Sequence, residues 1–160
     1  MVFRMEDLDH PKVKPGAALE TMQDLRWLGL DWDEGPDVGG DFGPYYQSQR
    51  NDLYGAAVEQ LLASGAAYRD YATPEEMRVE REAAEREKRR FVYSRNWMAE
   101  TDEQKALFES EGRQAVVRLK MVRDGECRFN DHIRGEVAVA WAEEPDHVIQ
   151  RTDGSVLYHL

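Results

Sequence analysis

The spacing of apolar residues predicts helices in the first two thirds of the chain and strands in the last third. Apolar residues recur at helical spacing over residues 18–28, and Gly29 follows where a C-terminal cap is expected. A second helix is predicted from about Arg50, with Gly65 as its stop. The Gly-, Pro- and Asp-rich stretch 31–46 between them predicts a long surface loop.

Two capping boxes predict two further helices. Thr73 with Glu76 begins one that runs to about residue 90, and Thr101 with Gln104 begins a short one that Gly112 closes. The first of these helices is nearly all charged, so it has few side chains to bury. We expect it to project or to line a surface.

After Gly112 the apolar period changes to two, which indicates strands. Residues 117–121 alternate apolar and cationic side chains, and Asp124-Gly125 predicts a hairpin turn to the next strand. Three more strands are expected at residues 127–129, 136–141 and 148–151, and a turn at Asp153-Gly154 before a last extended stretch, 156–160.

Composition indicates a folded protein without a membrane span. The 160 residues are 41% hydrophobic and 33% charged, and no apolar run approaches the length needed to cross a bilayer. The N-terminus carries acidic residues where a signal peptide would be apolar, so a cytoplasmic location is expected. Cys127 is the single cysteine and the four histidines show no ligand-like spacing, so neither a disulfide nor a metal site is predicted.

The net charge of -11 argues against nonspecific binding to nucleic-acid phosphates. Any RNA contact would need a local basic patch. The dense basic cluster is Arg86, Lys88, Arg89 and Arg90, and glutamates interleave with it. A solvated helix face and an RNA contact are both open interpretations of this cluster.

A short β-type run at residues 2–5 leads into an acidic segment that contains Glu6, Asp7 and Asp9 beside Arg4. Carboxylates at the end of a strand that feeds a helix can hold an ammonium group or a cation. The alternative is that these acids form a turn and a helix cap.

The same segment carries a family resemblance. Residues 4–9, Arg-Met-Glu-Asp-Leu-Asp, resemble the R-I-E-D-T-D segment of the glutamyl-tRNA synthetases, and residues 27–36 are nearly identical to the family's sequence there. In the family the glutamate of this segment helps to recognise the amino group of the substrate glutamate, which implies that role for Glu6. Leu8 departs from the family threonine and has no hydroxyl to donate at that position.

Two further matches lie in the middle of the chain. Residues 45–50, Tyr-Tyr-Gln-Ser-Gln-Arg, resemble the family's Y-x-Q-S-E-R, which leads into a helix ending at Ala67-Tyr68-Arg69. Zinc-containing members then carry Cys-x-Cys, where this chain has Asp70 and Ala72. The resemblance therefore implies the zinc-free branch.

The strand-rich part resembles the family's inserted acceptor-stem-binding domain. Residues 116–120 are similar to its V-R-x-K element and residues 129–135 to its F-x-D-x-x-R-G element. Residues 146–160 are similar to the return strand, whose tyrosine, here Tyr158, contacts the substrate amino acid. Possible tRNA contacts are Arg118, Arg134, Lys88 and Arg89, although Arg134-Gly135 is equally open to interpretation as a turn between strands.

The implied fold class is α/β: a partial doubly wound, Rossmann-like class I synthetase catalytic domain with an inserted α+β acceptor-stem-binding domain. Residues 1–67 would begin the nucleotide-binding fold, 68–142 form the insertion, and 143–160 return to the fold. The parent enzyme would join L-glutamate to the acceptor end of tRNA(Glu) with ATP and Mg²⁺, as a monomer. The 160 residues contain neither an H-x-G-H nor a K-M-S-K-S type segment, so no catalytic residue is assigned and the chain alone is expected to be inactive.

Two other functions are open. One is the glutamyl-queuosine type of synthetase, for which the inserted domain looks too long. The other is a non-catalytic, synthetase-derived module that binds a protein through the charged helix at residues 75–90.

Overall fold

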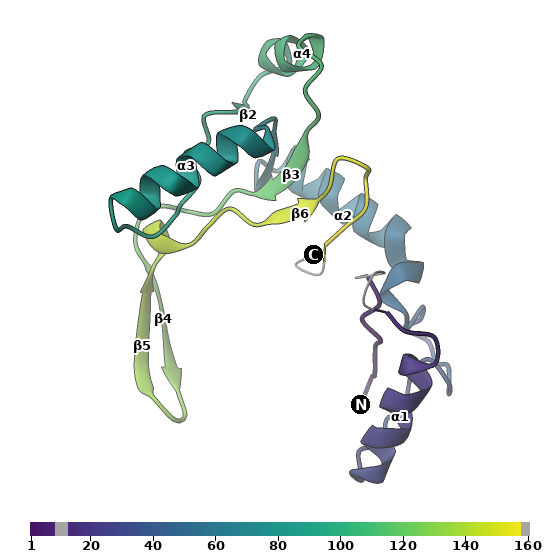
Figure 1. Ribbon diagram of the computed structural model, residues 1–160. Helices are drawn as coiled ribbons and strands as arrows, with labels where there is room; N and C mark the ends of the chain where they lie inside the picture. Colours follow the sequence, from purple (N-terminus) through teal and green to yellow (C-terminus); the bar gives the residue numbers. More distant parts are fainter. Residues whose placement is uncertain (9–12, 158–160) are drawn as a thin grey trace. The chain divides into compact units, whose positions relative to one another are not determined.

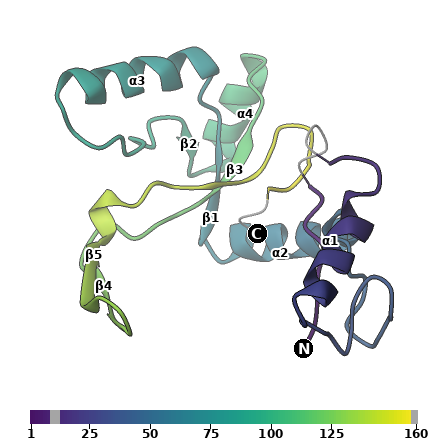
Figure 2. The ribbon, with the colours of Figure 1, turned by 60° about the horizontal axis from the view of Figure 1, so that its bottom comes forward.

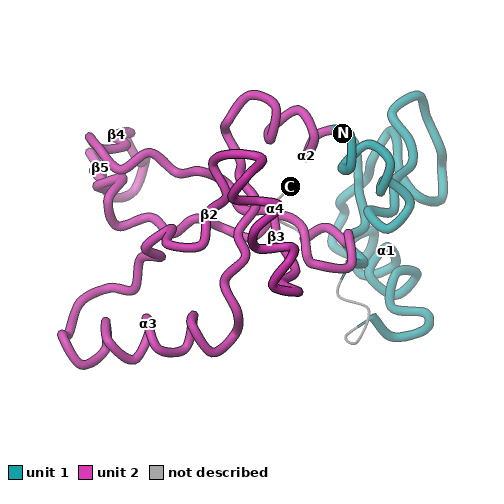
Figure 3. The backbone as a smooth tube through the Cα atoms, turned by 90° about the horizontal axis from the view of Figure 1, so that it is seen from above, with its two compact units in different colours: residues 1–56, 160 teal, residues 57–159 magenta. Residues whose placement is uncertain are grey.

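The computed structural model of the protein describes residues 1–8 and 13–157 (Figure 1). The chain forms two compact units, Met1–Ala56 and Ala57–His159, which Figure 3 colours separately. Among the described residues, no helix has the length and apolar character required to cross a membrane.

The first unit contains the predicted helix, α1 (Ala17–Trp27), and Gly29 beyond it has the left-handed φ of 78° that such a cap requires. The predicted β-type run at residues 2–5 is extended and pairs in parallel at two isolated bridges, Val2 with Glu34 and Met5 with Tyr46. This run therefore lies along both ends of the loop over residues 31–46.

That loop is held in place by its own side chains. The Trp32 indole nitrogen donates to Asp37 at 2.9 Å, and the Trp32 ring lies 4.7 Å from the Phe3 ring, centroid to centroid. Glu34 accepts from the Tyr45 hydroxyl at 2.6 Å. Gly35 is required here, because a Cβ on it would lie 2.7 Å from the Trp32 ring.

A 3-10 turn, η1 (Gln47–Arg50), leads into α2 (Asn51–Ala63), as predicted, and Gly65 follows with a φ of 73°. The prediction that this helix reaches Ala67-Tyr68-Arg69 is wrong. Those residues begin a strand, β1 (Ala67–Asp70), because the left-handed Gly65 ends the helix before them.

Strand β1 lies inside an antiparallel sheet of the second unit. The order is β2 (Met98–Ala99), β1, β3 (Val116–Leu119) and β6 (Val148–Gln150), and Tyr68 faces Arg118 in the register of β1 and β3. The buried core includes Val58, Tyr68, Tyr71, Val117 and Ile149.

The predicted hairpin at Asp124-Gly125 is wrong. The turn exists, with Gly125 at a φ of 83°, but β3 pairs with β1 and β6, while β4 (Glu126–Asp131) pairs with β5 (Gly135–Ala140). The tight turn of the real hairpin follows Asp131, whose carboxylate accepts from the backbone amides of Ile133 and Arg134 at 2.8 Å. An Asp-Gly pair signals a turn but does not determine which strands pair.

Both capping boxes are confirmed, and they begin α3 (Pro74–Arg86) and α4 (Asp102–Ser110). Helix α3 ends before the expected residue 90, with Lys88 in the left-handed region at a φ of 55°. Figures 1 and 2 show α3 as a straight rod and the β4–β5 hairpin projecting from the second unit. Ala84 is the buried residue of α3, in agreement with its charged sequence.

Candidate functional site

The acidic segment divides into one exposed carboxylate and one that is engaged. Glu6 is exposed, and its Oε1 accepts from the Leu8 amide at 2.9 Å. Asp7 instead accepts from the Ser48 amide at 2.8 Å and from the Ser48 hydroxyl at 2.5 Å. Asp7 therefore anchors the start of η1 and does not cap α1, whose N-cap is Gly16, while Glu6 has carboxylate surface left to meet a ligand. Asp9 lies outside the described residues.

Tyr158, the second predicted glutamate contact, also lies outside the described residues. The chain that leads to it folds back on β6 as predicted. The Arg151 amide donates to the Ser155 carbonyl at 2.8 Å, and the Leu157 amide donates to the Ile149 carbonyl at 2.9 Å. The turn at Asp153-Gly154 is therefore confirmed.

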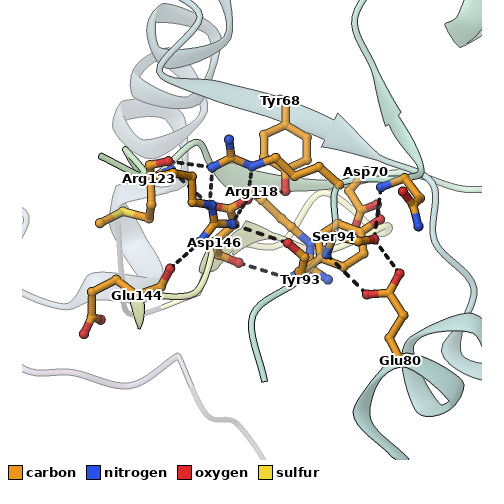
Figure 4. Close-up of polar contacts among 12 residues, drawn as sticks. Tyr68, Asp70, Glu80, Tyr93, Ser94, Arg118, Arg123, Glu144 and Asp146 are labelled. Atoms are coloured by element: carbon orange, nitrogen blue, oxygen red, sulfur yellow. Dashed lines mark hydrogen bonds and ion pairs between the residues drawn. The ribbon is translucent and has the colours of Figure 1, made fainter. Parts of the chain in front are cut away.

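Arg118 lies in a buried polar cluster of the second unit (Figure 4). Its Nε donates to Asp70 at 2.6 Å, and its Nη1 donates to the Asp146 backbone carbonyl at 3.1 Å. Asp70 also accepts from the Tyr93 hydroxyl at 2.5 Å. The side chain of Arg118 is 12% exposed and that of Asp70 is fully buried, so much of this guanidinium is occupied within the protein. A tRNA contact by Arg118 stays a prediction.

Asp146 is the other carboxylate of the cluster, and it lies two residues before β6. Arg95 donates to the Asp146 carboxylate from Nε at 2.6 Å and from Nη2 at 2.8 Å. The Tyr68 hydroxyl donates to the same carboxylate at 2.8 Å, and the Met121 amide donates to it at 3.0 Å. Arg123 adds an ion pair at 3.1 Å. Burial by itself would raise the pKa of Asp146, but the hydrogen bonds from Arg95 and Tyr68 hold it below its usual range.

Sequence reasoning missed this cluster as a unit. Tyr68 and Asp146 are 78 positions apart, and Arg118 and Asp70 are 48 apart, so no local motif joins them. The available signal was Asp70, a position that the family resemblance had already singled out. Within the described ranges, no group of three or more His, Cys, Asp or Glu side chains is placed to hold a metal ion. The absence of zinc stays a prediction.

The remaining predicted tRNA contacts are exposed and lie on separate elements. Lys88 and Arg89 follow α3, and Arg89 donates to Glu87 at 2.6 Å. Arg134 lies in the turn of the β4–β5 hairpin. The neighbouring Arg90 pairs loosely with Glu143 and Glu144 at 3.7 and 3.6 Å, so acids partly neutralise the basic cluster in space as well as in sequence.

Arg113 joins the start of α3 to the end of α4. It makes a two-pronged pair with Glu76 at 2.9 and 3.0 Å, pairs with Glu111 at 2.9 Å, and its guanidinium carbon lies 3.9 Å from the centroid of the Trp97 ring. The Arg113 hydrogen bonds lower the pKa of Glu76 to about 2. Glu76 is therefore both a helix cap and half of this ion pair.

Replacing Glu76 with glutamine is expected to lower the urea midpoint of unfolding at pH 7. The pKa of Glu76 is lower in the folded protein than its ordinary 4.5, so its contribution to stability is present above pH 4.5 and is lost as the pH falls toward 2. The gap between wild type and Glu76→Gln should shrink over that range in urea titrations. Glu85→Gln, an exposed acid of the same helix, is the control, and a gap that stays constant with pH would contradict the assignment.

The mixed α/β fold and the motif order define the class. The chain belongs to the family described as tRNA synthetases class I (E and Q), catalytic domain, whose family model matches residues 1–160. Within it, the chain is homologous over its whole length to glutamate–tRNA ligases. The chain is 44% identical over 160 residues to the glutamate–tRNA ligase of Streptomyces griseus subsp. griseus. The match covers 100% of this chain and 32% of that relative. The glutamate–tRNA ligase of Symbiobacterium thermophilum is 42% identical over 159 residues, which cover 99% of this chain and 33% of that relative.

A solved structure supports the same family assignment. The crystal structure of a glutamate tRNA ligase from Elizabethkingia meningosepticum in complex with its amino acid is 34% identical, with a TM-score of 0.84 over 99% of this chain and 33% of that one. The resemblance to glutamyl-tRNA synthetases is thus confirmed. The chain spans about a third of the length of the relatives it matches.

Proposed function

We propose that these 160 residues are part of the catalytic domain of a glutamate–tRNA ligase, about a third of the whole enzyme, which joins glutamate to tRNA at the expense of ATP. The observation that carries this proposal is the homology to such ligases at 42% to 45% identity along the whole chain. Residues 1–67 would begin the Rossmann-like fold, 68–142 the inserted acceptor-binding domain, and 143–160 the return. The parallel bridges of residues 2–5 support the first assignment, whereas β6 of the proposed return pairs with β3 of the proposed insertion.

Glu6 would bind the ammonium group of the substrate glutamate. Its exposed carboxylate lies at the end of the extended run, beside Asp7, whose own carboxylate is held by Ser48. A charge-assisted hydrogen bond from an ammonium group is worth about 1.5–3 kcal/mol. Tyr158 would be the second contact to the amino acid.

The acceptor end of tRNA would meet the second unit. Lys88, Arg89 and Arg134 are exposed cations there, and they can neutralise phosphates in a chain whose net charge is -11. Arg118 would act from inside the polar cluster. The same unit carries the two elements that resemble the family's acceptor-binding insertion.

The parent ligase would use ATP and Mg²⁺, and the residues that would hold them are not assigned within this chain. No metal-holding group of acidic or histidine side chains is found within the described ranges, and the 160 residues contain neither phosphate-binding segment. We therefore assign no step of adenylate formation to this chain, and expect the 160-residue protein alone to show no glutamylation.

A chimera tests this proposal. The corresponding third of the Streptomyces griseus ligase is replaced with this chain, and tRNA charging with radiolabelled glutamate is measured. We expect the chimera to charge tRNA, and Glu6→Gln within it to raise KM for glutamate about 10- to 100-fold, as loss of one charged hydrogen bond requires. Glu20→Gln, an exposed acid of α1, is the control. A well-folded chimera without charging, or charging by the 160-residue chain alone, would overturn the proposal.

A further inference from the structure

The chain contains two Asp-Gly pairs, Asp124-Gly125 and Asp153-Gly154, and both lie in exposed turns in which the glycine has a left-handed φ of 83°. An aspartate before a glycine is chemically vulnerable, because glycine has no Cβ to hinder attack of its amide nitrogen on the aspartate side chain. The local sequence gives the two pairs the same vulnerability. Their hydrogen bonds in the folded protein are different.

Both reacting groups of Asp153-Gly154 are engaged. The Asp153 carboxylate accepts from the Ser155 hydroxyl at 2.6 Å and from the Ser155 amide at 2.9 Å, and these bonds hold its pKa below its usual range. The Gly154 amide donates to the Arg151 carbonyl at 3.0 Å. An ionised carboxylate is a poor electrophile and a hydrogen-bonded amide is a poor nucleophile, so the fold protects this pair.

The reacting groups of Asp124-Gly125 are not engaged. Among the residues that the structure describes, the Asp124 carboxylate accepts no hydrogen bond and joins no ion pair, and the Gly125 amide donates to no acceptor. The space around Gly125 is open, since a Cβ placed on it would meet only a Trp141 ring carbon, at 3.9 Å. Nothing in the described structure therefore hinders the reaction of this pair.

We propose that Asp124 is a modification site at which the folded chain spontaneously forms isoaspartate, while Asp153 is protected. The Gly125 amide nitrogen bonds to Cγ of Asp124, and the amide proton leaves with the carboxyl hydroxyl as one water, which closes a succinimide ring. Water then opens the ring at either carbonyl. Opening at the main-chain carbonyl gives isoaspartate, in which the backbone runs through Cβ and Cγ. The inference does not depend on the proposed ligase function.

The modification would disturb contacts on both sides of the turn. The preceding residue, Arg123, pairs with Asp146 at 3.1 Å in the buried polar cluster and donates to the Glu144 carbonyl at 2.7 Å. On the other side, the Gly125 carbonyl accepts from the Trp141 amide at 3.1 Å, at the base of the β4–β5 hairpin. Isoaspartate lengthens the backbone between these anchors, so the modified protein should unfold at a lower urea concentration than the fresh protein.

The test incubates the 160-residue chain at neutral pH and follows both pairs by peptide mapping with electron-transfer mass spectrometry, which distinguishes isoaspartate from aspartate. Isoaspartate is expected to accumulate at least about tenfold faster at Asp124 than at Asp153, because reaction at Asp153 must first break the hydrogen bonds of both reacting groups. In urea, where the chain is unfolded, the two rates should become similar. Circular dichroism verifies that the sample without urea is folded.

Two variants make the test specific. Asp124→Glu keeps the charge but lengthens the side chain, so the five-membered ring cannot form and the loss of stability on incubation should disappear. Ser155→Ala removes one hydrogen bond from the Asp153 carboxylate and should raise the rate at Asp153 several-fold. Equal rates at the two pairs in the folded chain would overturn the proposal, as would a folded chain that forms no isoaspartate at Asp124, or a difference in rate that persists unchanged in urea.

Discussion

Asp146→Ala is expected to lower the free energy of unfolding of the second unit by about 3–5 kcal/mol, the usual cost of removing one partner from a buried ion pair. The Asp146 side chain is fully buried and pairs with Arg95 and Arg123. Its loss would leave the Tyr68 hydroxyl and the Met121 amide without their acceptor and would remove the buried charge that pairs with the two guanidiniums. Urea unfolding followed by circular dichroism measures the change.

Two companions make this measurement specific. Asp146→Asn keeps an oxygen that can accept from Tyr68 and Met121 but removes the charge. Its free energy of unfolding should therefore lie between those of wild type and Asp146→Ala. Asp124→Ala removes an exposed acid close in sequence and should change stability by less than about 0.5 kcal/mol. If Asp146→Ala and Asp124→Ala unfold at the same urea concentration, the cluster does not stabilise the fold.

Arg118→Met is expected to lower the free energy of unfolding by a comparable amount, about 3–5 kcal/mol, because the fully buried Asp70 carboxylate loses its ion-pair partner. Methionine retains the apolar stem of the arginine, so packing changes little. The expected result is a large fall in the urea midpoint.

This variant also separates two roles for Arg118. If the side chain served tRNA binding alone, Arg118→Met would unfold like wild type and lose RNA affinity only. Arg134→Met is the matched control, since Arg134 is exposed on the β4–β5 hairpin and its replacement should leave the urea midpoint unchanged. A wild-type midpoint for Arg118→Met would contradict the structural role.

Helix positions in this protein could be predicted from the sequence because their signals are local. The Thr73–Glu76 and Thr101–Gln104 capping boxes each span only one helical turn. Both partners of each box can therefore be recognised within four consecutive residues of the sequence. Gly29 and Gly65 end their helices because their left-handed backbone carries little strain in glycine. None of these features needs a distant partner.

Strand pairing could not be predicted in the same way. Tyr68 and Arg118 face each other across β1 and β3 although fifty positions separate them, and the sequence between them contains two helices. Asp124-Gly125 marks a turn correctly, yet β3 finds its neighbours in β1 and β6. Pairing is decided by which strands can be buried together, and that is a property of the whole unit.

By itself, then, the sequence determined the family, the caps and the position of Glu6, because each depends on residues close together along the chain. Tertiary structure alone decided what the cations do. Arg118, a predicted RNA contact, donates instead to Asp70, because a buried carboxylate is costly unless a partner pairs with it.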